Sequence, residues 1–371
     1  MSFTFTEQPD AIVGANSPII YQVYDSTNYT TPKFNYQFQV YVWSGTTTIP
    51  ATPVVTIKRL PDQYGGGRAW IDIHKIVTQY ITTEFLINGT YKPNIGSGAK
   101  RVAVKCQGYV DTTPIGSVIT SSLSLATKGY AYTAEGFNQG FTKAVFTDKT
   151  ALYLTTYTPT AYIWYDATVI TSITVGSTTV TPNTVTTSDQ AIQGIDIKQL
   201  LTIAGLFGTN CNVTFVKAGD DVVLPVVFDC QNKYGQQDVL FLNRYGVYDS
   251  YLFNGVSRMT YNVTSEQYAQ PIFKQADLAQ SWSYGVQITT PYLQNSTEVM
   301  TVNTDWIPET DVPIVEQIFY STNVLIENGS DVLSARVIDT AFEFKKRTNE
   351  KLIQYTIQLE YNQPKINKIV R

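Results

Sequence analysis

The residue types that most often perform acid, base or metal chemistry are scarce in this sequence. The chain has one histidine, His74, so a Ser-His-Asp triad or a histidine-based metal site would depend on that residue alone. His74 lies in the first turn of a predicted short helix, and we expect it to be a polar residue on an exposed helix face. The sequence predicts no catalytic residue, no metal ligand and no cofactor-binding residue, and we expect no cofactor and no enzyme activity.

Paired carboxylates could hydrolyse a glycosidic bond if two of them lay about 5 to 9.5 Å apart in one cleft. The candidate acids are Asp220, Asp221, Glu298, Asp305, Glu309 and Asp311. All of them occur in turn-like stretches, so we interpret them as solvated loop acids. A glycosidase that digests a cell envelope is therefore the second alternative function.

The cysteines and the amino-terminal residues bear on the cellular compartment. Cys106, Cys211 and Cys230 are odd in number and widely spaced, which fits neither a disulfide framework nor a zinc site. We expect small, buried or half-buried thiols in reducing surroundings. The first residues, MSFTFTEQPDA, have no basic start and no apolar segment, so we expect no signal peptide. Apolar runs are also far shorter than the roughly 20 residues of a membrane span.

The composition favours β-sheet and excludes one broad function class. Charged residues make up 15% of the chain and hydrophobic residues 43%, with 26 tyrosines, and β-branched and aromatic residues favour strands. The formal net charge of −4 lacks the positive excess that non-specific nucleic-acid binding requires, so we expect no direct nucleic-acid binding. A length of 371 residues predicts two or three domains.

Period-2 hydrophobic patterns predict many short strands. Strand-like runs occupy residues 3–6, 19–24, 34–43, 54–60, 69–73, 102–110 and 118–125. In 34–43 the large apolar residues occupy every second position, so one face packs against a core. The run PDQYGGGR at 61–68 connects two such strands and is interpreted as a turn, since a phosphate-binding loop would require Gly-Lys-Ser/Thr and a helix.

A short internal repeat links two distant parts of the chain. Ile71, Asp72, Ile73 and Thr78 recur in the same spacing as Ile195, Asp196, Ile197 and Thr202. In each copy a strand ends at the aspartate and a short helix follows, so Asp72 and Asp196 are predicted helix N-caps. The repeat predicts two related β-sandwich-like domains, each with one short helix. A chance match over so few residues stays open as the alternative.

These patterns predict an all-β fold in three parts. We expect a β-sandwich-like domain over 1–128, a second, duplicated one over 129–257, and a connector with a hairpin-rich C-terminal domain over 258–371. Residues 260–283 are polar and lack a period, so they are predicted to be an extended connector. Asn328-Gly329 predicts a hairpin between 323–327 and 330–336. Residues 352–361 show the most regular alternation in the chain.

The carboxyl-terminal stretch carries an excess of positive charge. Residues 342–371 hold seven basic residues and three acids, although the whole chain is acidic. Such an asymmetry could bring the stretch into contact with an acidic neighbouring subunit, and a hairpin tip with a solvated tail explains it equally well. The candidate assembly contacts are Lys345, Lys346, Arg347, Lys365, Lys368 and Arg371.

Several segments together resemble a known class of proteins. The segment FLNRYGVYDSYLF at 241–253 follows DCQNKYGQQDV at 229–239, and Asn-Arg-Tyr-Gly at 243–246 is its most distinctive part. Together with residues 61–76 and 341–363, these segments resemble β-rich virion structural proteins of tailed bacteriophages. The resemblance implies synthesis in the host cytoplasm without an export signal, followed by assembly into a capsid, neck, tail or fibre.

The sequence and the resemblance lead to one main expectation and a first alternative. We expect a non-enzymatic virion subunit that assembles with its own copies and with neighbouring virion proteins, with a tail, neck or collar component favoured over a capsid accessory protein. The alternative is a carbohydrate- or host-receptor-binding module of a tail fibre or spike, in which Tyr and Trp side chains would stack on sugars. Neither function requires a membrane-inserted segment.

Overall fold

Strands dominate the secondary structure. The computed structural model describes residues 3–62, 66–82, 94–95, 98–155, 161–187, 190–228, 234–269, 273–276, 279–282, 289–328, 331–339, 341–343, 352–362 and 365–368. Strands account for 52% of the structure and helices for 9%, so the predicted all-β class with few short helices is confirmed. Within the described ranges, no helix has the length and apolar character needed to cross a membrane.

The chain forms two compact units. Unit 1 comprises Met1–Gln231, Phe241–Ser250 and Pro313–Thr322, and unit 2 comprises Asn232–Leu240, Tyr251–Val312 and Asn323–Arg371. Both units are therefore discontinuous in sequence. The predicted boundaries near residues 128 and 257 stay a prediction.

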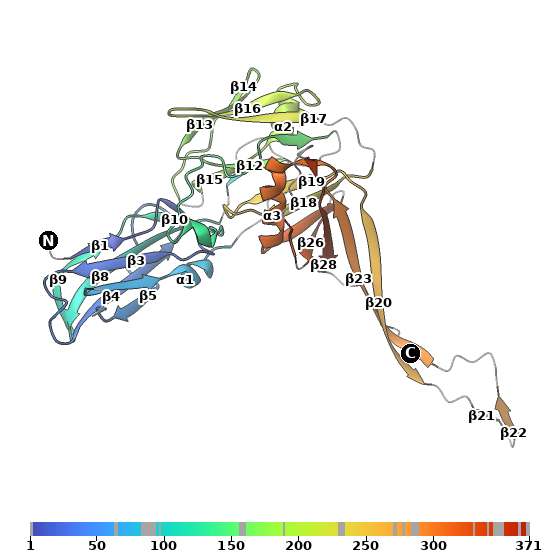
Figure 1. Cartoon of the computed structure of the whole chain (residues 1–371), viewed down its shortest axis with the longest axis horizontal. Helices are drawn as coiled ribbons and strands as arrows, with labels where there is room; N and C mark the ends of the chain where they lie inside the picture. The colour runs from blue at the N-terminus through green and yellow to red at the C-terminus, as the bar shows by residue number, and fades with distance from the viewer. Residues whose placement is uncertain are drawn as a thin grey trace. The chain divides into compact units, whose positions relative to one another are not determined.

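The first part of unit 1 is a sandwich of two sheets (Figure 1). One sheet has the order β1 (Phe3–Glu7), β3 (Ile20–Asp25), β6 (Arg68–Asp72). The other has the order β2 (Ile12–Gly14), β10 (Ser124–Thr127), β8 (Lys100–Val110), β4 (Phe34–Trp43), β5 (Val55–Arg59), and β9 (Thr113–Thr120) also pairs with β8. The alternation predicted for 34–43 is confirmed, because Tyr36 and Phe38 of β4 are fully buried while Gln37 and Gln39 are partly exposed. The run predicted as one strand over 118–125 is instead split between β9 and β10.

The second part of unit 1 is another sandwich. Its smaller sheet has the order β12 (Tyr162–Asp166), β15 (Ile192–Asp196), β7 (Asn94–Ile95). Its larger sheet has the order β11 (Leu152–Leu154), β17 (Val222–Phe228), β16 (Cys211–Lys217), β13 (Ile170–Val175), β14 (Thr178–Val180). Tyr165 and Phe215, on facing sheets, are fully buried with ring centroids 5.8 Å apart. Burying large aromatic side chains between the sheets is the main stabilising contribution to such a core.

The two sandwiches share one topology. In the first, β2 and β10 are parallel, and the pairs β10–β8, β8–β4 and β4–β5 are antiparallel. In the second, β11 and β17 are parallel, and the pairs β17–β16, β16–β13 and β13–β14 are antiparallel. The antiparallel pair β3–β6 likewise matches β12–β15. Chain order and strand direction are therefore repeated.

Each sandwich also has one short helix after the repeated aspartate. Oδ1 of Asp196 accepts hydrogen bonds from the backbone N–H of Lys198 (3.0 Å) and of Ala161 on the neighbouring chain segment (3.2 Å). Asp196 is the N-cap of α2 (Ile197–Ile203). Oδ1 of Asp72 accepts the equivalent bonds from the N–H groups of His74 and Ile19, both 3.1 Å.

The two caps differ in one position. The N-cap of α1 (His74–Thr78) is Ile73 rather than the predicted Asp72, because the chain turns into the helix one residue later. Each aspartate nevertheless ties the helix start to the adjacent strand.

Unit 2 contains one large sheet. Its strand order is β19 (Tyr248–Phe253), β18 (Gln237–Leu242), β25 (Val324–Asn328), β26 (Asp331–Val337), β28 (Thr356–Tyr361), β23 (Thr289–Asn303), β20 (Arg258–Ala269), and β29 (Lys365–Lys368) also pairs with β23. β18 and β19 continue into the unit 1 residues Phe241–Ser250. Two small sheets pair β21 (Phe273–Ala276) with β22 (Ala279–Trp282) and β24 (Ile307–Pro308) with β27 (Leu352–Ile353).

The remaining helical elements are short. They are α3 (Val312–Tyr320) and the 3-10 turns η1 (Thr133–Glu135) and η3 (Glu309–Asp311). The predicted hairpin over 323–336 is confirmed by the antiparallel pairing of β25 and β26, in which Asn328 opposes Asp331, while Gly329 lies outside the described residues. The alternation over 352–361 is confirmed as well, although the segment is divided into two strands, β27 and β28.

Removing the carboxylates of the repeat tests its contribution to stability. Asp196 is fully buried, and burial raises the pKa of its carboxyl although backbone hydrogen bonds lower it. We expect Asp196→Ala to reduce the free energy of unfolding by about 2 to 3 kcal/mol, because two buried N–H groups lose their acceptor. Asp72→Ala should cost about 1 kcal/mol, since Asp72 is partly exposed and water can replace it. Asp196→Asn keeps the Oδ1 acceptor and should lose less than half as much as Asp196→Ala. Urea unfolding of the full chain measures all three, and equal losses for the two alanine variants would contradict the analysis.

Candidate functional site

Unit 2 contains a long β-ribbon whose outer strand is exposed to solvent. It consists of β20, β23 and β29 and is called the ribbon below. β20 pairs with β23 over twelve residue pairs, from Arg258 opposite Thr301 to Ala269 opposite Thr289. All twelve residues of β20 are exposed. Figure 1 draws β20 and β23 as two long adjacent strands of unit 2. The ribbon is therefore held by backbone pairing and not by burial of β20.

This strand is where the sequence prediction was wrong. Residues 260–283 were predicted to be an extended connector and not strands of a sheet, but Arg258–Ala269 and Phe273–Ala276 are paired strands. The period-2 signal arises when one face of a strand is buried, and β20 buries neither face. Its only sequence indication is the β-favouring content of Thr, Tyr and Val.

The ribbon leaves one strand edge open. On one side β23 pairs with β20, and on the other side it pairs with β28 at Val299–Asn303 and with β29 at Leu293–Ser296. Among the described strands, none pairs with the outer edge of β20. An unpaired edge presents a row of N–H and C=O groups that another chain can pair with.

The predicted basic contacts fall partly in the ribbon. Lys365 and Lys368 lie in β29, on the side of β23 opposite to β20. Lys345, Lys346, Arg347 and Arg371 lie outside the described residues. The carboxyl-terminal stretch thus contributes a strand to the same element, which charge counting alone did not indicate.

An apolar row continues the buried face of the sheet onto the ribbon. Residues directly opposite each other in antiparallel strands share a face, and the pairs Leu359–Met300 and Met300–Met259 form one such row. Leu359 and Met300 are buried, whereas Met259 and the next two residues on its face, Tyr261 and Val263, are 40%, 55% and 62% exposed. The apolar face therefore extends beyond the part that the chain itself covers.

Two polar groups, the Tyr361 hydroxyl and the Glu298 carboxylate, lie next to this apolar row. Tyr361, next to Leu359 on the buried face, donates its hydroxyl to Sδ of Met300 at 3.8 Å. Burial raises the pKa of Tyr361, and the nearby Glu298 and Tyr261 raise it further. Glu298 lies in β23, so the interpretation of this acid as a loop residue was wrong.

A second notable feature is the Asn-Arg-Tyr-Gly turn of unit 1, called the turn anchor below and comprising residues 243–246. The N–H of Gly246 donates to the carbonyl of Asn243 at 3.0 Å and closes the turn between β18 and β19. The Asn243 side chain donates to the carbonyl of Phe146 at 2.8 Å and accepts from the N–H of Tyr245 at 3.0 Å. One buried amide thus fixes the turn on a neighbouring segment.

Charged groups hold the turn anchor from two sides. One guanidinium nitrogen of Arg244, Nη2, donates to both Glu135 oxygens at 2.8 and 2.9 Å, and such charge-assisted hydrogen bonds are stronger than neutral ones. Asp148 accepts hydrogen bonds from the Tyr245 hydroxyl at 2.7 Å and from Gln317 at 2.8 Å, and it also pairs with Lys143. Burial alone would raise the pKa of Asp148, but the bonds from Lys143 and Tyr245 outweigh it and lower the pKa.

The backbone fits closely around this turn. Gly246 has φ +79, and a Cβ there would lie 2.3 Å from the backbone N of Gly129. The N–H of Tyr130 donates to the carbonyl of Arg244 at 2.8 Å. The turn anchor is therefore attached to unit 1 at several points, and the carboxylates of Glu135 and Asp148 that contact it both accept hydrogen bonds.

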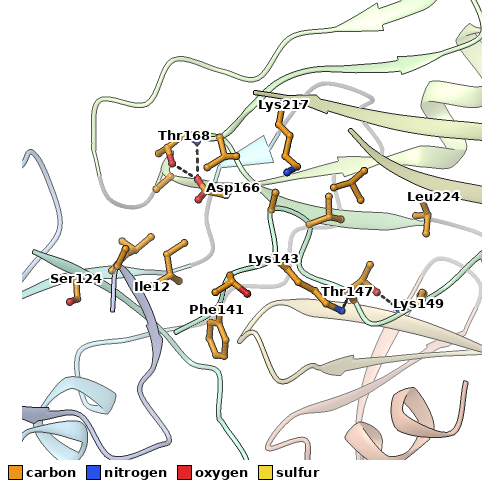
Figure 2. Close-up of a pocket in the computed structure, with 18 of the residues that line it drawn as sticks. Ile12, Ser124, Phe141, Lys143, Thr147, Lys149, Asp166, Thr168, Lys217 and Leu224 are labelled. Carbon is orange, nitrogen blue, oxygen red and sulfur yellow. Dashed lines mark hydrogen bonds between the residues drawn. The ribbon is translucent and has the colours of Figure 1, made fainter. Parts of the chain in front are cut away.

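Unit 1 also contains a pocket of about 770 Å³ (Figure 2). Its basic lining residues are Arg101, Lys143, Lys149 and Lys217. Asp166 is the single acid among its described lining residues, and its Oδ1 accepts bonds from the N–H and the hydroxyl of Thr168 at 2.8 and 2.6 Å. Lys149 forms a buried ion pair of 2.6 Å with Asp249. The pocket lacks the pair of facing carboxylates that glycoside hydrolysis uses.

The other sequence candidates are dispersed. His74 is half-buried with Nδ1 2.9 Å from Oδ2 of Asp72, and so it is not the freely exposed residue expected. Asp221 accepts from the N–H of Lys217 in the turn between β16 and β17. Cys106 is buried and Cys211 half-buried, both as free thiols, and Cys230 lies outside the described residues. In the described ranges, no three His, Cys, Asp or Glu side chains converge as a metal site would require.

Comparisons with known proteins add no further identification. No protein-family model matches the chain, and no curated protein sequence matches it.

The close fit of the turn anchor predicts a strong effect of one methyl group. We expect Gly246→Ala to reduce the free energy of unfolding of the full chain by about 3 kcal/mol or more, because the methyl group meets fixed backbone. Gly205→Ala is the matched control, since Gly205 has φ +68 with open space around it and should cost only about 1 kcal/mol. Thermal unfolding measures both variants. Similar losses would show that the anchor does not constrain the fold.

The Asp148 network predicts a defined pH dependence. The lowered pKa of Asp148 means that the stability it provides is present above the usual carboxyl pKa and is lost as the pH falls through the folded-state value. We therefore expect Asp148→Asn to cost about 2 kcal/mol at pH 7 and progressively less below about pH 4. Urea unfolding of both proteins across this range tests the expectation. Asp220→Asn, at an exposed acid, is the control and should show no such convergence.

Proposed function

We propose that this chain is a non-enzymatic structural subunit of a tailed-phage virion, which assembles with its own copies and with neighbouring virion proteins. A tail, neck or collar position is favoured over a capsid accessory position. The observation that carries the proposal is the ribbon, in which β20 exposes all twelve residues and leaves its outer edge unpaired among the described strands. A protein that acts alone gains nothing from keeping such an element in water.

The apolar face of the ribbon supports an assembly role. Met259, Tyr261 and Val263 continue a buried sheet face and are left uncovered by the described chain. Large apolar and tyrosine side chains are typical anchors of protein interfaces. Because these side chains lie on an extended ribbon, a subunit can contact a neighbour through the ribbon alone.

The rest of the chain supports a rigid supporting role. The two sandwiches of unit 1 repeat one topology, and the turn anchor is held by the Arg244–Glu135 ion pair and by the buried amide of Asn243. The polar side chains of the anchor hold backbone segments together. Within the described residues, this use of carboxylates favours a structural role over a catalytic one.

The resemblance of residues 229–253 and 341–363 to virion structural proteins gives the proposal its biological setting. The distinctive Asn-Arg-Tyr-Gly run coincides with the turn anchor, where each of the four residues has a defined contact or conformation. The resemblance therefore falls on a segment with a structural task. These contacts support the proposal of a stable structural subunit.

Disrupting the apolar face of the ribbon tests the proposal. We expect the full chain to self-associate or to bind purified virion subassemblies, and Val263→Lys to weaken that association at least about tenfold, because a charge replaces an apolar contact. Val223→Lys is the matched control at a valine of β17 that is 50% exposed. Light scattering measures association, and mass spectrometry of purified particles measures incorporation. A strictly monomeric chain that is absent from particles would refute the proposal.

A further inference from the structure

The outer edge of β20 lacks the features that usually prevent strand pairing. Edge strands are commonly protected by lysine, by proline or by short length. β20 has twelve residues, Arg-Met-Thr-Tyr-Asn-Val-Thr-Ser-Glu-Gln-Tyr-Ala, without lysine or proline. This edge is therefore available for main-chain pairing with another strand.

Two copies of β20 that run antiparallel to each other have complementary charges. Its two charged residues are Arg258 and Glu266, and Asn262 lies midway between them. If two copies of β20 pair antiparallel about a two-fold axis at Asn262, Arg258 of each copy lies directly opposite Glu266 of the other. No other antiparallel register places these two residues directly opposite each other. Opposite charges in cross-strand positions stabilise a pair, and like charges destabilise it.

The same register matches the two faces of the strand. It places Thr260 opposite Thr264 on the polar face, and it places Tyr261 opposite Val263 on the apolar face. The exposed apolar row of one copy would then continue into the row of the other. Thr–Thr and aromatic–β-branched pairs are both favourable across strands.

A backbone irregularity marks the end of the matched segment. The pairing of β20 with β23 is regular from Arg258 to Glu266 and shifts between Glu266 and Gln267. The regular segment is thus nine residues long with Asn262 at its centre. The residue skipped at this shift is Tyr292 of β23, so the self-complementary segment of β20 is the part that pairs with β23 in unbroken register.

The two charged side chains of β20 differ in the contacts that they make within one copy. Glu266 accepts the Tyr292 hydroxyl at 2.5 Å, which holds its carboxylate on the ribbon. Arg258 is exposed, and among the described residues it has no recorded ion pair or side-chain hydrogen bond. A second copy would supply the missing acid.

We propose that two copies of this chain join through β20 in an antiparallel, two-fold symmetric pair centred on Asn262. The partner of the ribbon is therefore a second copy, and the two sheets become one continuous sheet across the axis. An interface of this kind is isologous, because each copy contributes the same strand. The inference rests on the proposed function, since it names the partner of the same ribbon.

Charge reversal tests the register. Arg258→Glu and Glu266→Arg should each raise the dimer dissociation constant at least about tenfold, because each places like charges opposite each other. The double variant restores opposite charges and should return to within about threefold of the wild type. Sedimentation equilibrium of the full chain measures all four proteins. A double variant weaker than both single variants overturns the proposal.

Cross-linking tests the position of the axis independently of affinity. Asn262→Cys places two thiols opposite each other, at a Cα separation of about 4.5 to 5.5 Å that a disulfide can span. Ser265→Cys is the control, because residue 265 would face Met259 of the other copy. Oxidation should give a dimer for Asn262→Cys and not for Ser265→Cys or the wild type. Equal cross-linking of both variants, or none, overturns the proposal.

Particle analysis separates the two levels of inference. If the chain is present in purified particles but Asn262→Cys does not cross-link in them or in solution, self-pairing is refuted and the structural function stands. If Asn262→Cys cross-links in solution but the chain is absent from particles, self-pairing stands and the virion function is refuted.

Discussion

Backbone hydrogen bonding at strand edges is the constraint on which this architecture depends. With 52% of the structure in strands, each sheet must either pair its outer strands or leave N–H and C=O groups to water. In unit 1 the outer strands of the larger sheets have three to eight residues, from β14 with three to β5 with five and β9 with eight. In unit 2 the sheet ends in the twelve residues of β20. Among the described strands, β20 is therefore the longest sheet edge that is exposed over its whole length.

In unit 1, several carboxylates accept hydrogen bonds from groups that the sheets leave unpaired. Asp72 and Asp196 each accept two N–H groups where a strand gives way to a helix. Asp148 and Glu135 fix the turn anchor through Lys143, Tyr245 and Arg244. In each case the carboxylate satisfies donors of chain segments that are distant in the sequence, and it thereby connects those segments.

The sequence revealed the elements with one buried face and missed those without one. The strands at 34–43 and 352–361 and the Asn-Gly hairpin follow local rules of alternation and turn chemistry, and the repeat around Asp72 and Asp196 was readable because identical residues occupy identical positions. β20 was missed because both its faces are wet, so no period marks it. The turn anchor and the basic pocket join residues more than a hundred positions apart, such as Glu135 with Arg244. Local patterns carry no information about such pairings.

The parallel pairing of β2 with β10, and of β11 with β17, has a mechanical consequence. These are the first and last strands of the larger sheet in each sandwich, so the chain enters and leaves that sheet at opposite ends. Tension applied along the polypeptide would load the hydrogen bonds between the two strands in shear. All of them would then have to break together, whereas an antiparallel terminal pair could be unzipped one bond at a time. The strand arrangement of each sandwich therefore resists mechanical unfolding, irrespective of its thermodynamic stability.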